Sequence, residues 1–441
     1  MSVFKAYDVR GIYPKELDEK IAYIIGRAFG TLFSGRIVVG GDARLSTPKL
    51  KESLINGLMD SGIEVIDIGF VPTPIVYFAC YGIGFDFGIS VTGSHLPKEH
   101  NGMKFCNSKG IPIGYEDGLE KVEELTKTKY FKKGVGKIEK LEVVKKYSNF
   151  IKSLVHESLD GFKIVVDGAN GIAGKIYSDI LRECGLEVIE IYCEPDGNFP
   201  NHVPDPMQKE FMLDLEKKVK EIGADLGFGF DGDGDRVLVV DKNGSINPNH
   251  IFSILIEDAI KNGDKVIHDV LCSKLVEDVI RKKGGTPIVS RVGHTFIARK
   301  CIEENAVMGG EFSGHYFFKE SNYTDDVLVA CIKLLSVLKK TGKSVSELTS
   351  SYPKYYSYAD RLPVREEEKF KFIENLKDKL KKDGYEIVTL DGVRVNFKHG
   401  WMLFRPSNTE AKISVGLESS DKEEFEKIKL IAEEIIKTIP R

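Results

Sequence analysis

The sequence has few of the residues from which disulfide scaffolds and thiolate metal sites are built. It holds seven cysteines in 441 residues, and no two of them form a CxxC pair. An odd number of scattered cysteines argues against a disulfide framework and against a zinc site made of thiolates. Unpaired cysteines are typical of a reducing compartment, so we expect a cytoplasmic protein.

The sequence also lacks long hydrophobic runs and an excess of positive charge. No stretch approaches the roughly 18 apolar residues of a membrane span. The N-terminal residues MSVFKAYDVRG carry charges where a signal peptide would need its apolar run. The formal net charge of -4 argues against nucleic acid as the main partner. We therefore expect a protein that has neither a membrane nor a nucleic-acid partner.

The length predicts several domains, because 441 residues exceed what one ordinary core accommodates. Short β-branched runs alternate with helical patterns through the first three quarters of the chain. The runs expected as strands include 36–40, 64–68, 85–91, 163–167, 186–191, 224–230 and 265–270. The expected helices include 48–61, 115–127, 141–155, 273–283 and 296–305. This alternation predicts three α/β units in series, which we place at 1–150, 151–248 and 249–355.

The order of elements changes after residue 355. A helix is expected near 366–382, several strands between 385 and 416, and a last helix at 421–437. Helices that flank a group of consecutive strands are typical of an α+β domain. The last unit, 356–441, is therefore predicted to be a smaller α+β domain.

The most informative motif is DGDGDR at 231–236, which directly follows the apolar run 226–230. Asp231, Asp233 and Asp235 alternate with glycines, so a tight turn brings three carboxylates to one point. Three anionic oxygens suit a hard divalent cation, and we expect Mg2+. The adjacent Arg236 indicates that a phosphate binds at the same place.

Other interpretations of this motif fit less well. An EF-hand would need glycine at the sixth and glutamate at the twelfth loop position, where this chain has Arg236 and Lys242. A GxGxxG match at Gly227, Gly229 and Gly232 precedes a β-branched run instead of the helix that dinucleotide binding requires. A solvated hairpin turn would explain the glycines, but not three aspartates that repel one another without a cation.

A second polar loop, TGSHLP at 92–97, also follows an apolar run, and Lys104 lies shortly after it. Ser94 stands in a glycine-bordered turn beside His95, which suits a nucleophile or a phosphate carrier. An ordinary helix cap is the alternative interpretation of this serine. A Walker A loop is not formed, because Ser94 and His95 occupy the positions of its lysine and hydroxyl residue.

Two further loops have ligand-binding chemistry. GGEFSGH at 309–315 places Glu311, Ser313 and His315 at alternate positions, a set of donors and acceptors suited to sugar hydroxyls. A polar turn between strands is the alternative there. RPSNTE at 405–410 combines a guanidinium with hydroxyl and amide groups, which suits a phosphate, although a solvated surface turn is the commoner case. Its polar residues are Arg405, Ser407, Asn408 and Thr409.

In their order and separations, these four loops resemble those of the α-D-phosphohexomutase family, most closely its phosphomannomutase/phosphoglucomutase branch. The resemblance covers essentially the whole chain, and the concurrence of many motifs makes it specific. The other matching motifs are YDVRG at 7–11, VGGDAR at 39–44, VPTP at 71–74, NG at 101–102, PDG at 195–197, FPNH at 199–202 and VGHT at 292–295.

The resemblance implies a fold and an activity. The fold would be three similar α/β domains with mixed sheets and a smaller C-terminal α+β domain, arranged in a heart shape around a central cleft. The activity would be the interconversion of hexose 1-phosphate and hexose 6-phosphate, with mannose and/or glucose as the sugar. A phosphoserine enzyme and a hexose 1,6-bisphosphate intermediate would connect the two. A monomer or homodimer is expected.

The resemblance also implies roles for individual residues. Ser94 would carry the phosphoryl group and, together with Asp231, Asp233 and Asp235, would hold Mg2+. Glu311 would contact the sugar hydroxyls. The remaining expected site residues are Arg10, Lys104 and His315 for proton transfer and positioning, Ser313 for the sugar, Arg236 and His294 as lining residues, and Arg405, Ser407, Asn408 and Thr409 for the phosphate that does not react.

Three places depart from the family pattern, and alternative functions stay open. Asp325-Asp326 replaces a common Asp-Gly pair. Leu96 stands where the serine loop usually has asparagine, and Ser414 stands where relatives often have arginine, so the rate and the substrate balance are not fixed by the resemblance. One alternative is a phosphoglucosamine mutase. Another is an aspartyl-phosphate-type phosphatase with Asp231 as nucleophile and Asp233 as acid. A third is a binding protein with a metal-stabilised fold.

Overall fold

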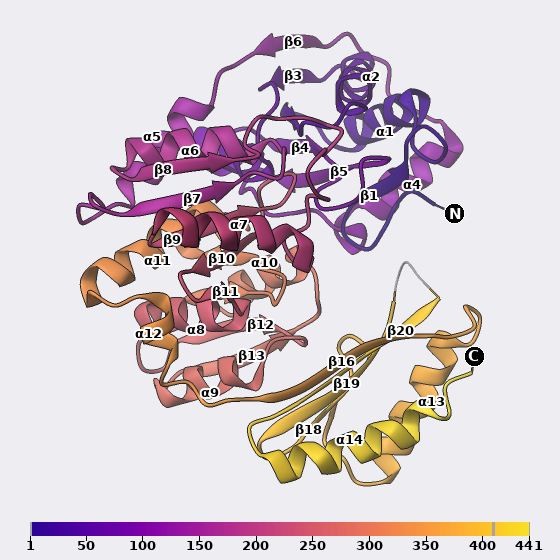
Figure 1. The fold of residues 1–441 in the computed structure, drawn as a ribbon. Coiled ribbons are helices and arrows are strands. Elements are labelled where there is room, and N and C mark those ends of the chain that lie inside the picture. The colour runs from indigo at the N-terminus through magenta and orange to yellow at the C-terminus, as the bar shows by residue number, and fades with distance from the viewer. Residues whose placement is uncertain (1, 408–410, 441) are drawn as a thin grey trace.

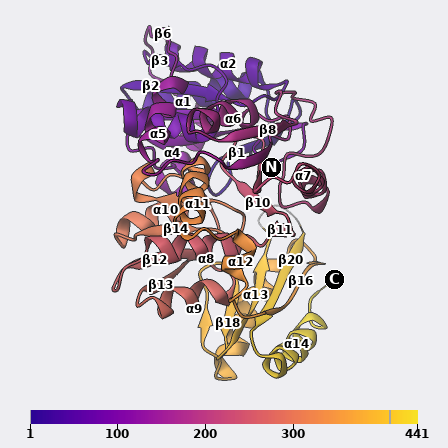
Figure 2. The same cartoon turned by 60° about the vertical axis from the view of Figure 1, so that its left-hand side comes forward.

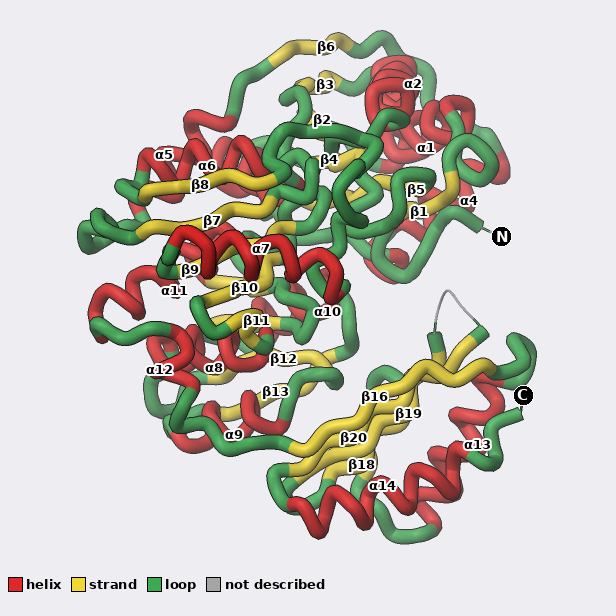
Figure 3. The backbone as a smooth tube through the Cα atoms, viewed as in Figure 1, coloured by secondary structure: helices red, strands yellow, loops and turns green. Residues whose placement is uncertain are grey.

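Four β-sheets follow one another along the chain, each with its own helices (Figure 1). The computed structural model describes residues 2–407 and 411–440. Three sheets lie in the larger part of the molecule, and the fourth forms a separate layer with two helices near the C-terminus (Figure 3). The predicted class, three α/β units followed by a smaller α+β unit, is confirmed, while the boundaries proposed between the units stay predictions.

The first sheet has six strands in the order β1-β5-β4-β2-β3-β6 and is mixed. Its strands are β1 (Val9–Ile12), β2 (Arg36–Gly41), β3 (Glu64–Asp67), β4 (Phe87–Val91), β5 (His100–Asn107) and β6 (Lys137–Lys140). Its helices are α1 (Glu19–Leu32), α2 (Thr47–Asp60), α3 (Thr73–Phe78), η1 (Ala79–Ile83), η2 (Tyr115–Asp117), α4 (Leu119–Thr128) and α5 (Val144–Ser153). Successive β2 residues face opposite sides, so Val38 packs in the core with α3 and Val39 in the core with α1 and α2.

The second sheet has the order β11-β10-β9-β7-β8. Its elements are β7 (Lys163–Asp167), α6 (Ala173–Glu183), β8 (Glu187–Ile191), α7 (Lys209–Ile222), β9 (Leu226–Phe230), β10 (Val237–Asp241) and β11 (Gly244–Ile246). β9 pairs in parallel with β7 and antiparallel with β10. The aspartate loop is the connection of this β9–β10 hairpin, so two buried strands fix both of its ends.

The third sheet has the order β13-β12-β14-β15. Its elements are α8 (Pro248–Ala259), β12 (Lys265–Asp269), α9 (Lys274–Lys282), β13 (Thr286–Ser290), α10 (His294–Glu303), β14 (Met308–Gly310), β15 (Tyr316–Phe318), η3 (Lys319–Ser321), α11 (Val327–Thr341) and α12 (Val345–Thr349). The loop with Glu311 connects the antiparallel strands β14 and β15. The backbone N–H of Val237 donates to the carbonyl oxygen of Gly314 at 3.2 Å, which ties this loop to the second sheet.

The fourth sheet is antiparallel throughout, in the order β16-β20-β19-β18-β17. Its elements are β16 (Tyr356–Pro363), α13 (Lys369–Lys382), β17 (Ile387–Val388), β18 (Val393–Asn396), β19 (Gly400–Pro406), β20 (Lys412–Ser419) and α14 (Lys422–Ile436). Met402 and Phe404 pack in the core with α13 and α14, whereas Trp401 and Leu403 pack against Val270 of the third unit. The sheet is thus a layer between its own helices and the neighbouring unit, beside α9 (Figure 2).

Two expectations about local structure differ from the structure. The helix expected at 115–127 is broken by Gly118, whose φ of 139° is outside the helical range, into η2 and α4. Residues 137–140, which are not among the expected strands, form the edge strand β6. Among the described residues, no helix combines the length and the hydrophobicity needed to cross a bilayer. The seven cysteines are all buried and free.

Candidate active site

The serine loop begins where the central strand β4 ends. Ser94 has a φ of 50°, which is unusual for a residue other than glycine. Its backbone N–H donates to Thr92 Oγ1 at 2.8 Å, and its own Oγ donates to Asp231 Oδ2 at 3.0 Å. Only 2% of Ser94 is exposed. The turn therefore presents this hydroxyl to the aspartate loop of the second unit and away from bulk solvent.

Arg44 holds the serine loop from its buried side. Its Nη2 donates to the carbonyl oxygens of Ser94 at 2.8 Å and Leu96 at 2.5 Å. Its Nη1 donates to the carbonyl oxygens of Pro97 at 2.7 Å and His100 at 3.0 Å. One buried guanidinium thus binds four carbonyl groups of this segment, of which that of Pro97 also accepts from the His100 N–H at 3.0 Å.

Asp42 compensates the charge of Arg44 and organises the same loop. Its Oδ2 accepts from Arg44 Nε at 3.1 Å, from the Gly93 N–H at 3.0 Å and from Thr92 Oγ1 at 2.8 Å. Its Oδ1 accepts from Thr47 Oγ1 at 2.6 Å. Because every contact is buried, the pair fixes the conformation of the serine turn.

The aspartate loop is folded around Asp231. Its Oδ1 accepts from the backbone N–H groups of Gly234, Asp235 and Arg236, at 3.0, 3.0 and 3.1 Å. Its Oδ2 is the atom that accepts from Ser94. Asp231 therefore both shapes its own turn and joins it to the serine loop.

Lys104 lies among the other two aspartates. Its Nζ donates to Asp233 Oδ2 at 2.8 Å and also contacts Asp235 Oδ2. Thr73 Oγ1 donates to the same oxygen of Asp233 at 2.8 Å. Burial alone would lower the pKa of the Lys104 ammonium, but the two carboxylates raise it above its ordinary value, so this lysine is charged.

The three aspartates have the donor set and the spacing of a metal site. Asp231, Asp233 and Asp235 are fully buried and place one carboxylate oxygen each within 4.8 Å of the others. Burial and the other two carboxylates raise the pKa of Asp231 well above its ordinary value. Within residues 2–407 and 411–440, the buried Asp233 Oδ1 has no hydrogen-bond partner. An oxygen without a partner among mutually repelling carboxylates fits a divalent cation, so the residues present can hold a metal ion.

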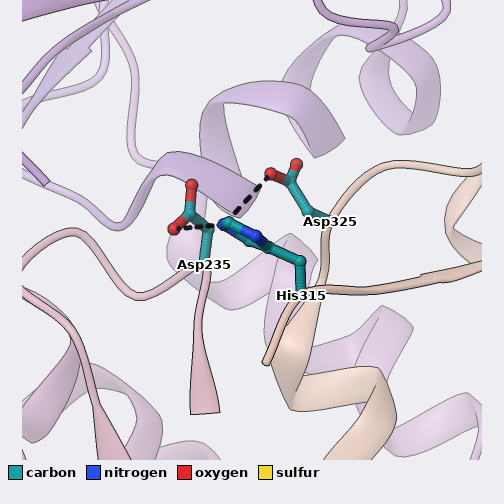
Figure 4. A group of neighbouring side chains, drawn as sticks. All are labelled: Asp235, His315 and Asp325. Carbon is teal, nitrogen blue, oxygen red and sulfur yellow. Dashed lines mark hydrogen bonds and ion pairs between the residues drawn. The ribbon is translucent and has the colours of Figure 1, made fainter. Parts of the chain in front are cut away.

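His315 lies between carboxylates on both sides of its ring. Its Nδ1 is 2.8 Å from Glu311 Oε2 and 3.0 Å from Ser313 Oγ. Its Nε2 is 3.2 Å from Asp235 Oδ1 and 4.0 Å from Asp325 Oδ2 (Figure 4). Burial alone would lower the pKa of this imidazole, but Asp235 and Glu311 raise it to about 10. The ring is therefore protonated at neutral pH and holds a proton that it can give up when its surroundings change.

Asp325 is a fully buried carboxylate beside this histidine. Neither of its oxygens has a hydrogen-bond partner among the described residues. Burial, then the charge of Asp235, raises the pKa of its carboxyl to about 7. The side chain points toward His315 from the segment that precedes α11 (Figure 4). A buried carboxylate without hydrogen bonds is costly, which indicates a role in the site.

Two other histidines of this centre have lowered pKa values. His95 Nδ1 lies 3.2 Å from Ser94 Oγ, and His294 begins α10 with a buried Nε2 that has no hydrogen-bond partner in the part of the chain that the structure describes. Burial, then the charges of neighbouring cations, lowers the pKa of both imidazoles well below the ordinary value. Both rings are therefore neutral at physiological pH.

The predicted arginines lie around the same centre. Arg10 Nη1 donates to the carbonyl oxygen of Thr92 at 2.7 Å, and its Nε donates to Asp8 at 2.7 Å. Arg236 Nε lies 3.4 Å from His315 Nε2. The serine loop, the aspartate loop and the Glu311 loop therefore meet in one polar centre.

The fourth loop approaches this centre through Arg405 at the end of β19. Arg405 acts electrostatically on Tyr7, as do Asp8, Glu311 and Arg236. Burial, then the charge of Asp8, raises the pKa of the Tyr7 hydroxyl. Tyr7 thus lies within the electrostatic range of all four units. Ser407 is half-buried after the strand, whereas two predicted phosphate ligands, Asn408 and Thr409, lie outside the described residues.

The sequence interpretation gave no role to several residues that shape this centre. Asp42, Arg44 and Thr73 lie in motifs on which the family resemblance rests, whereas Asp325 and Asp391 lie outside them. The contacts of all five have no sequence pattern. The catalytic and binding roles of all the predicted residues stay predictions.

Comparison with known families assigns the chain to one of them. Models of the phosphoglucomutase/phosphomannomutase family match four consecutive segments: alpha/beta/alpha domain I at 1–133, domain II at 144–244, domain III at 247–356 and the C-terminal domain at 361–435. The matched models and the names of the relatives define the class of the protein, an intramolecular phosphotransferase. The chain belongs to the phosphoglucomutase/phosphomannomutase family, and it is a hexose phosphate mutase.

Individual relatives agree over the full length. A phosphomannomutase/phosphoglucomutase from Pseudomonas aeruginosa is 37% identical over 99% of this chain and 96% of its own. A phosphomannomutase from Methanocaldococcus jannaschii is 36% identical over 97% of each chain. The crystal structure of a family protein from Burkholderia thailandensis superposes with a TM-score of 0.90 at 35% identity, covering 99% of this chain and 97% of that one.

Proposed function

We propose that this enzyme interconverts the 1-phosphate and the 6-phosphate of mannose or glucose through a phosphorylated Ser94. The observation that supports this assignment is the hydrogen bond between Ser94 Oγ and Asp231 Oδ2, which joins a buried hydroxyl to a group of three carboxylates. The names of the relatives support the two sugars.

The proposed reaction has two balanced halves. In the first, the bond between Ser94 Oγ and phosphorus breaks, a bond from a sugar oxygen to phosphorus forms, and the sugar hydroxyl gives its proton to a base in the site. The product is a hexose 1,6-bisphosphate. After the bisphosphate has reversed its orientation in the site, Ser94 Oγ takes the other phosphoryl group and the proton returns to the freed sugar oxygen. Phosphoryl transfer needs little covalent catalysis, so the protein accelerates it mainly by aligning the reacting groups and by stabilising charge in the transition state.

Asp231, Asp233 and Asp235 are proposed to hold Mg2+ together with an oxygen on Ser94. The bound ion would neutralise charge on the transferring group. Lys104 already contacts Asp233 and Asp235, so its ammonium is placed to contact the same group. Proton transfer is assigned to His315 or Lys104, the two groups that hold a proton between these carboxylates. A cation bound by the same carboxylates would weaken their hold on that proton, and the group that loses it would be the base that accepts the proton of the sugar hydroxyl.

Glu311 and Ser313 are proposed to contact the sugar hydroxyls, with His294 and Arg236 beside them. Arg10 would position the serine loop through Thr92. The phosphate that is not reacting would bind Arg405, Ser407, Asn408 and Thr409, where a guanidinium provides paired donors. A fixed phosphate site and a single reacting position suit a substrate that must be bound in two orientations.

All four loops come from one chain, so the proposed site needs no second subunit. We propose a monomer or a homodimer with one site in each chain. Seven free, buried cysteines favour the cytoplasm as its location.

The test begins with the position of the phosphate. Mass spectrometry of the enzyme incubated with glucose 1,6-bisphosphate should locate the phosphoryl group on Ser94, and Ser94→Ala should lose at least about 1,000-fold in kcat. Ser158→Ala, at an exposed serine, serves as the control. A phosphoryl group on Asp231 would instead support the phosphatase alternative and overturn the mutase mechanism.

The metal and the sugar are tested separately. After removal of divalent ions, phosphorylated Ser94 should persist without transferring its group, and added Mg2+ should restore transfer. Turnover of mannose 1-phosphate, glucose 1-phosphate and glucosamine 1-phosphate is then compared. A kcat/KM highest on glucosamine 1-phosphate would identify the phosphoglucosamine mutase alternative.

A further inference from the structure

We infer that Asp391 is a positioning residue that orients Arg405 for the phosphate and connects the phosphate-binding loop to the sugar-binding loop of the third unit. This inference rests on the function proposed above. It assigns a role to a carboxylate that lies outside the four loops of the predicted site.

The local fold brings Asp391 against the strand that ends in Arg405. Asp391 lies in the turn between β17 and β18, and the following Gly392 has a φ of 87°. A Cβ on Gly392 would lie 2.3 Å from the carbonyl oxygen of Phe404, so the turn crosses β19 at the residue before Arg405. This close approach determines where the Asp391 side chain emerges.

Asp391 Oδ2 accepts a hydrogen bond from Arg405 Nε at 2.8 Å. The side chains are 14% and 17% exposed, so the ion pair is mostly shielded from water. A guanidinium held at Nε has a fixed plane, which fixes the direction of its two terminal nitrogens. Asp391 therefore reduces the freedom that Arg405 would lose on binding a phosphate.

The same oxygen of Asp391 also contacts the third unit. It accepts from the Val292 N–H at 3.3 Å, and the next N–H, that of Gly293, donates to Glu311 Oε1 at 2.5 Å. Two consecutive backbone N–H groups thus connect Asp391 to Glu311. Arg405, Asp391 and Glu311 form a continuous polar path between the proposed phosphate and sugar contacts.

A second set of contacts holds the two units together near this path. Arg394 Nη2 donates to Glu277 Oε1 at 2.8 Å, and Glu418 Oε1 accepts from Ser273 Oγ at 2.8 Å and from the Lys274 N–H at 2.7 Å. The apolar contacts of Val270 with Trp401 and Leu403 adjoin them. The turn with Asp391 is therefore held against the third unit by more than its own hydrogen bonds.

The experiment measures binding without turnover. In a Ser94→Ala parent, calorimetry with mannose 6-phosphate should show Asp391→Asn weakening the Kd about tenfold, with a larger loss for Asp391→Ala. Asn keeps an oxygen that accepts from Val292 but loses the charge that holds Arg405. In the active enzyme, Asp391→Asn should raise KM about tenfold and change kcat less than about threefold. Asp378→Asn, exposed on α13, is the matched control and should change neither constant.

A double-mutant cycle tests whether Asp391 acts through Arg405. Asp391→Asn should change the Kd less than about twofold once Arg405→Ala is present, because the positioned group is gone. An unchanged Kd in Asp391→Asn, or the same tenfold loss with and without Arg405, would overturn the inference while the proposed function stands. If the parent bound no hexose phosphate, the proposed function would fall, and this inference with it. Thermal melting of each variant identifies any that fail to fold.

Discussion

Arg44 Nη2 donates a hydrogen bond to the carbonyl oxygen of Ser94 at 2.8 Å, from a loop 50 residues earlier in the chain. The proposed phosphate carrier is thus held by its backbone, while its hydroxyl is directed toward Asp231. Burial, opposed by the charge of Asp42, lowers the pKa of Arg44 below its ordinary value. The serine turn owes its shape to this pair more than to its own sequence.

Replacement of Arg44 should therefore disable the enzyme and destabilise it. Arg44→Met removes the counter-charge of the buried Asp42 and one donor from each of four carbonyl groups, a change that costs about 3–5 kcal/mol. Chemical denaturation of the free enzyme measures this loss, and Arg44→Lys should recover only part of it because an ammonium cannot reach all four oxygens. Arg182→Met, at an exposed ion pair, should cost less than about 1 kcal/mol. Equal losses in the two Met variants would contradict this account.

The fold was largely predictable because its strands have strong hydrophobic patterns. Buried strands such as β2 and β9 are continuous apolar runs, and the sequence places them to within a residue or two. The edge strand β6 was not predicted, because all four of its residues are exposed and only its pairing with β3 makes it a strand. Long-range pairing, unlike local pattern, is not encoded in a short window of sequence.

The backbone of Gly232 brings the aspartate loop close to the serine loop. A Cβ there would lie 2.5 Å from the carbonyl oxygen of Ser94 and 3.2 Å from Pro204 Cβ. Gly232→Ala should therefore push the two loops apart, lengthen the contact between Ser94 and Asp231, and lower kcat at least about tenfold. Steady-state kinetics and phosphorylation of Ser94 by glucose 1,6-bisphosphate measure the effect.

Gly263→Ala is the matched control for this prediction. Gly263 has a φ of 89° and open space around it, so alanine there is strained but meets no neighbouring atom. It should cost about 1–2 kcal/mol of stability and leave kcat unchanged. A Gly232→Ala enzyme with the kcat of the unmodified protein would show that the close approach of the two loops is not needed.

The site was predictable where chemistry is concentrated in one motif and not where it depends on distant contacts. The spacing of Asp231, Asp233 and Asp235 was sufficient to predict a metal site. The neighbourhood of His315 was not, because Asp235 comes from a different unit and Asp325 has no motif of its own. A side chain that acts on a histidine across a domain boundary is visible only in three dimensions.

Asp325→Asn should raise the stability of the protein and lower its kcat. The carboxylate is fully buried and has no hydrogen bond among the described residues, so a neutral amide of the same shape removes a cost of about 1–3 kcal/mol. Above pH 7, where the Asp325 carboxyl is mostly ionised, the same change removes a negative charge near His315 Nε2 and should lower kcat at least about tenfold with little change in KM. Thermal melting and steady-state kinetics together check the two effects. A lower melting temperature with unchanged kcat would make Asp325 a purely structural residue.

Ionisation of Glu277, at the contact between the third and fourth units, should make the stability of the protein depend on pH in the acid range. Burial alone would raise the pKa of its carboxyl, but His268, Arg394 and Lys274 lower it to about 2. A carboxyl whose pKa is lower in the folded protein stabilises the fold fully above its unfolded pKa of about 4.5 and loses that contribution as the pH falls toward 2. The shift corresponds to roughly 3 kcal/mol. The free energy of unfolding should therefore fall between pH 5 and pH 2.

Glu277→Gln should flatten part of this pH dependence, because an amide cannot change its charge. Its effect is expected to be largest near pH 7, where the carboxylate pairs with Arg394 at 2.8 Å, and to shrink as the pH approaches 2. For Glu426→Gln, at an exposed position on α14, the curve of unfolding free energy against pH should run parallel to that of the unmodified protein. Curves of equal slope for Glu277→Gln and the unmodified protein would show that the ion pair with Arg394 does not govern the acid stability of this interface.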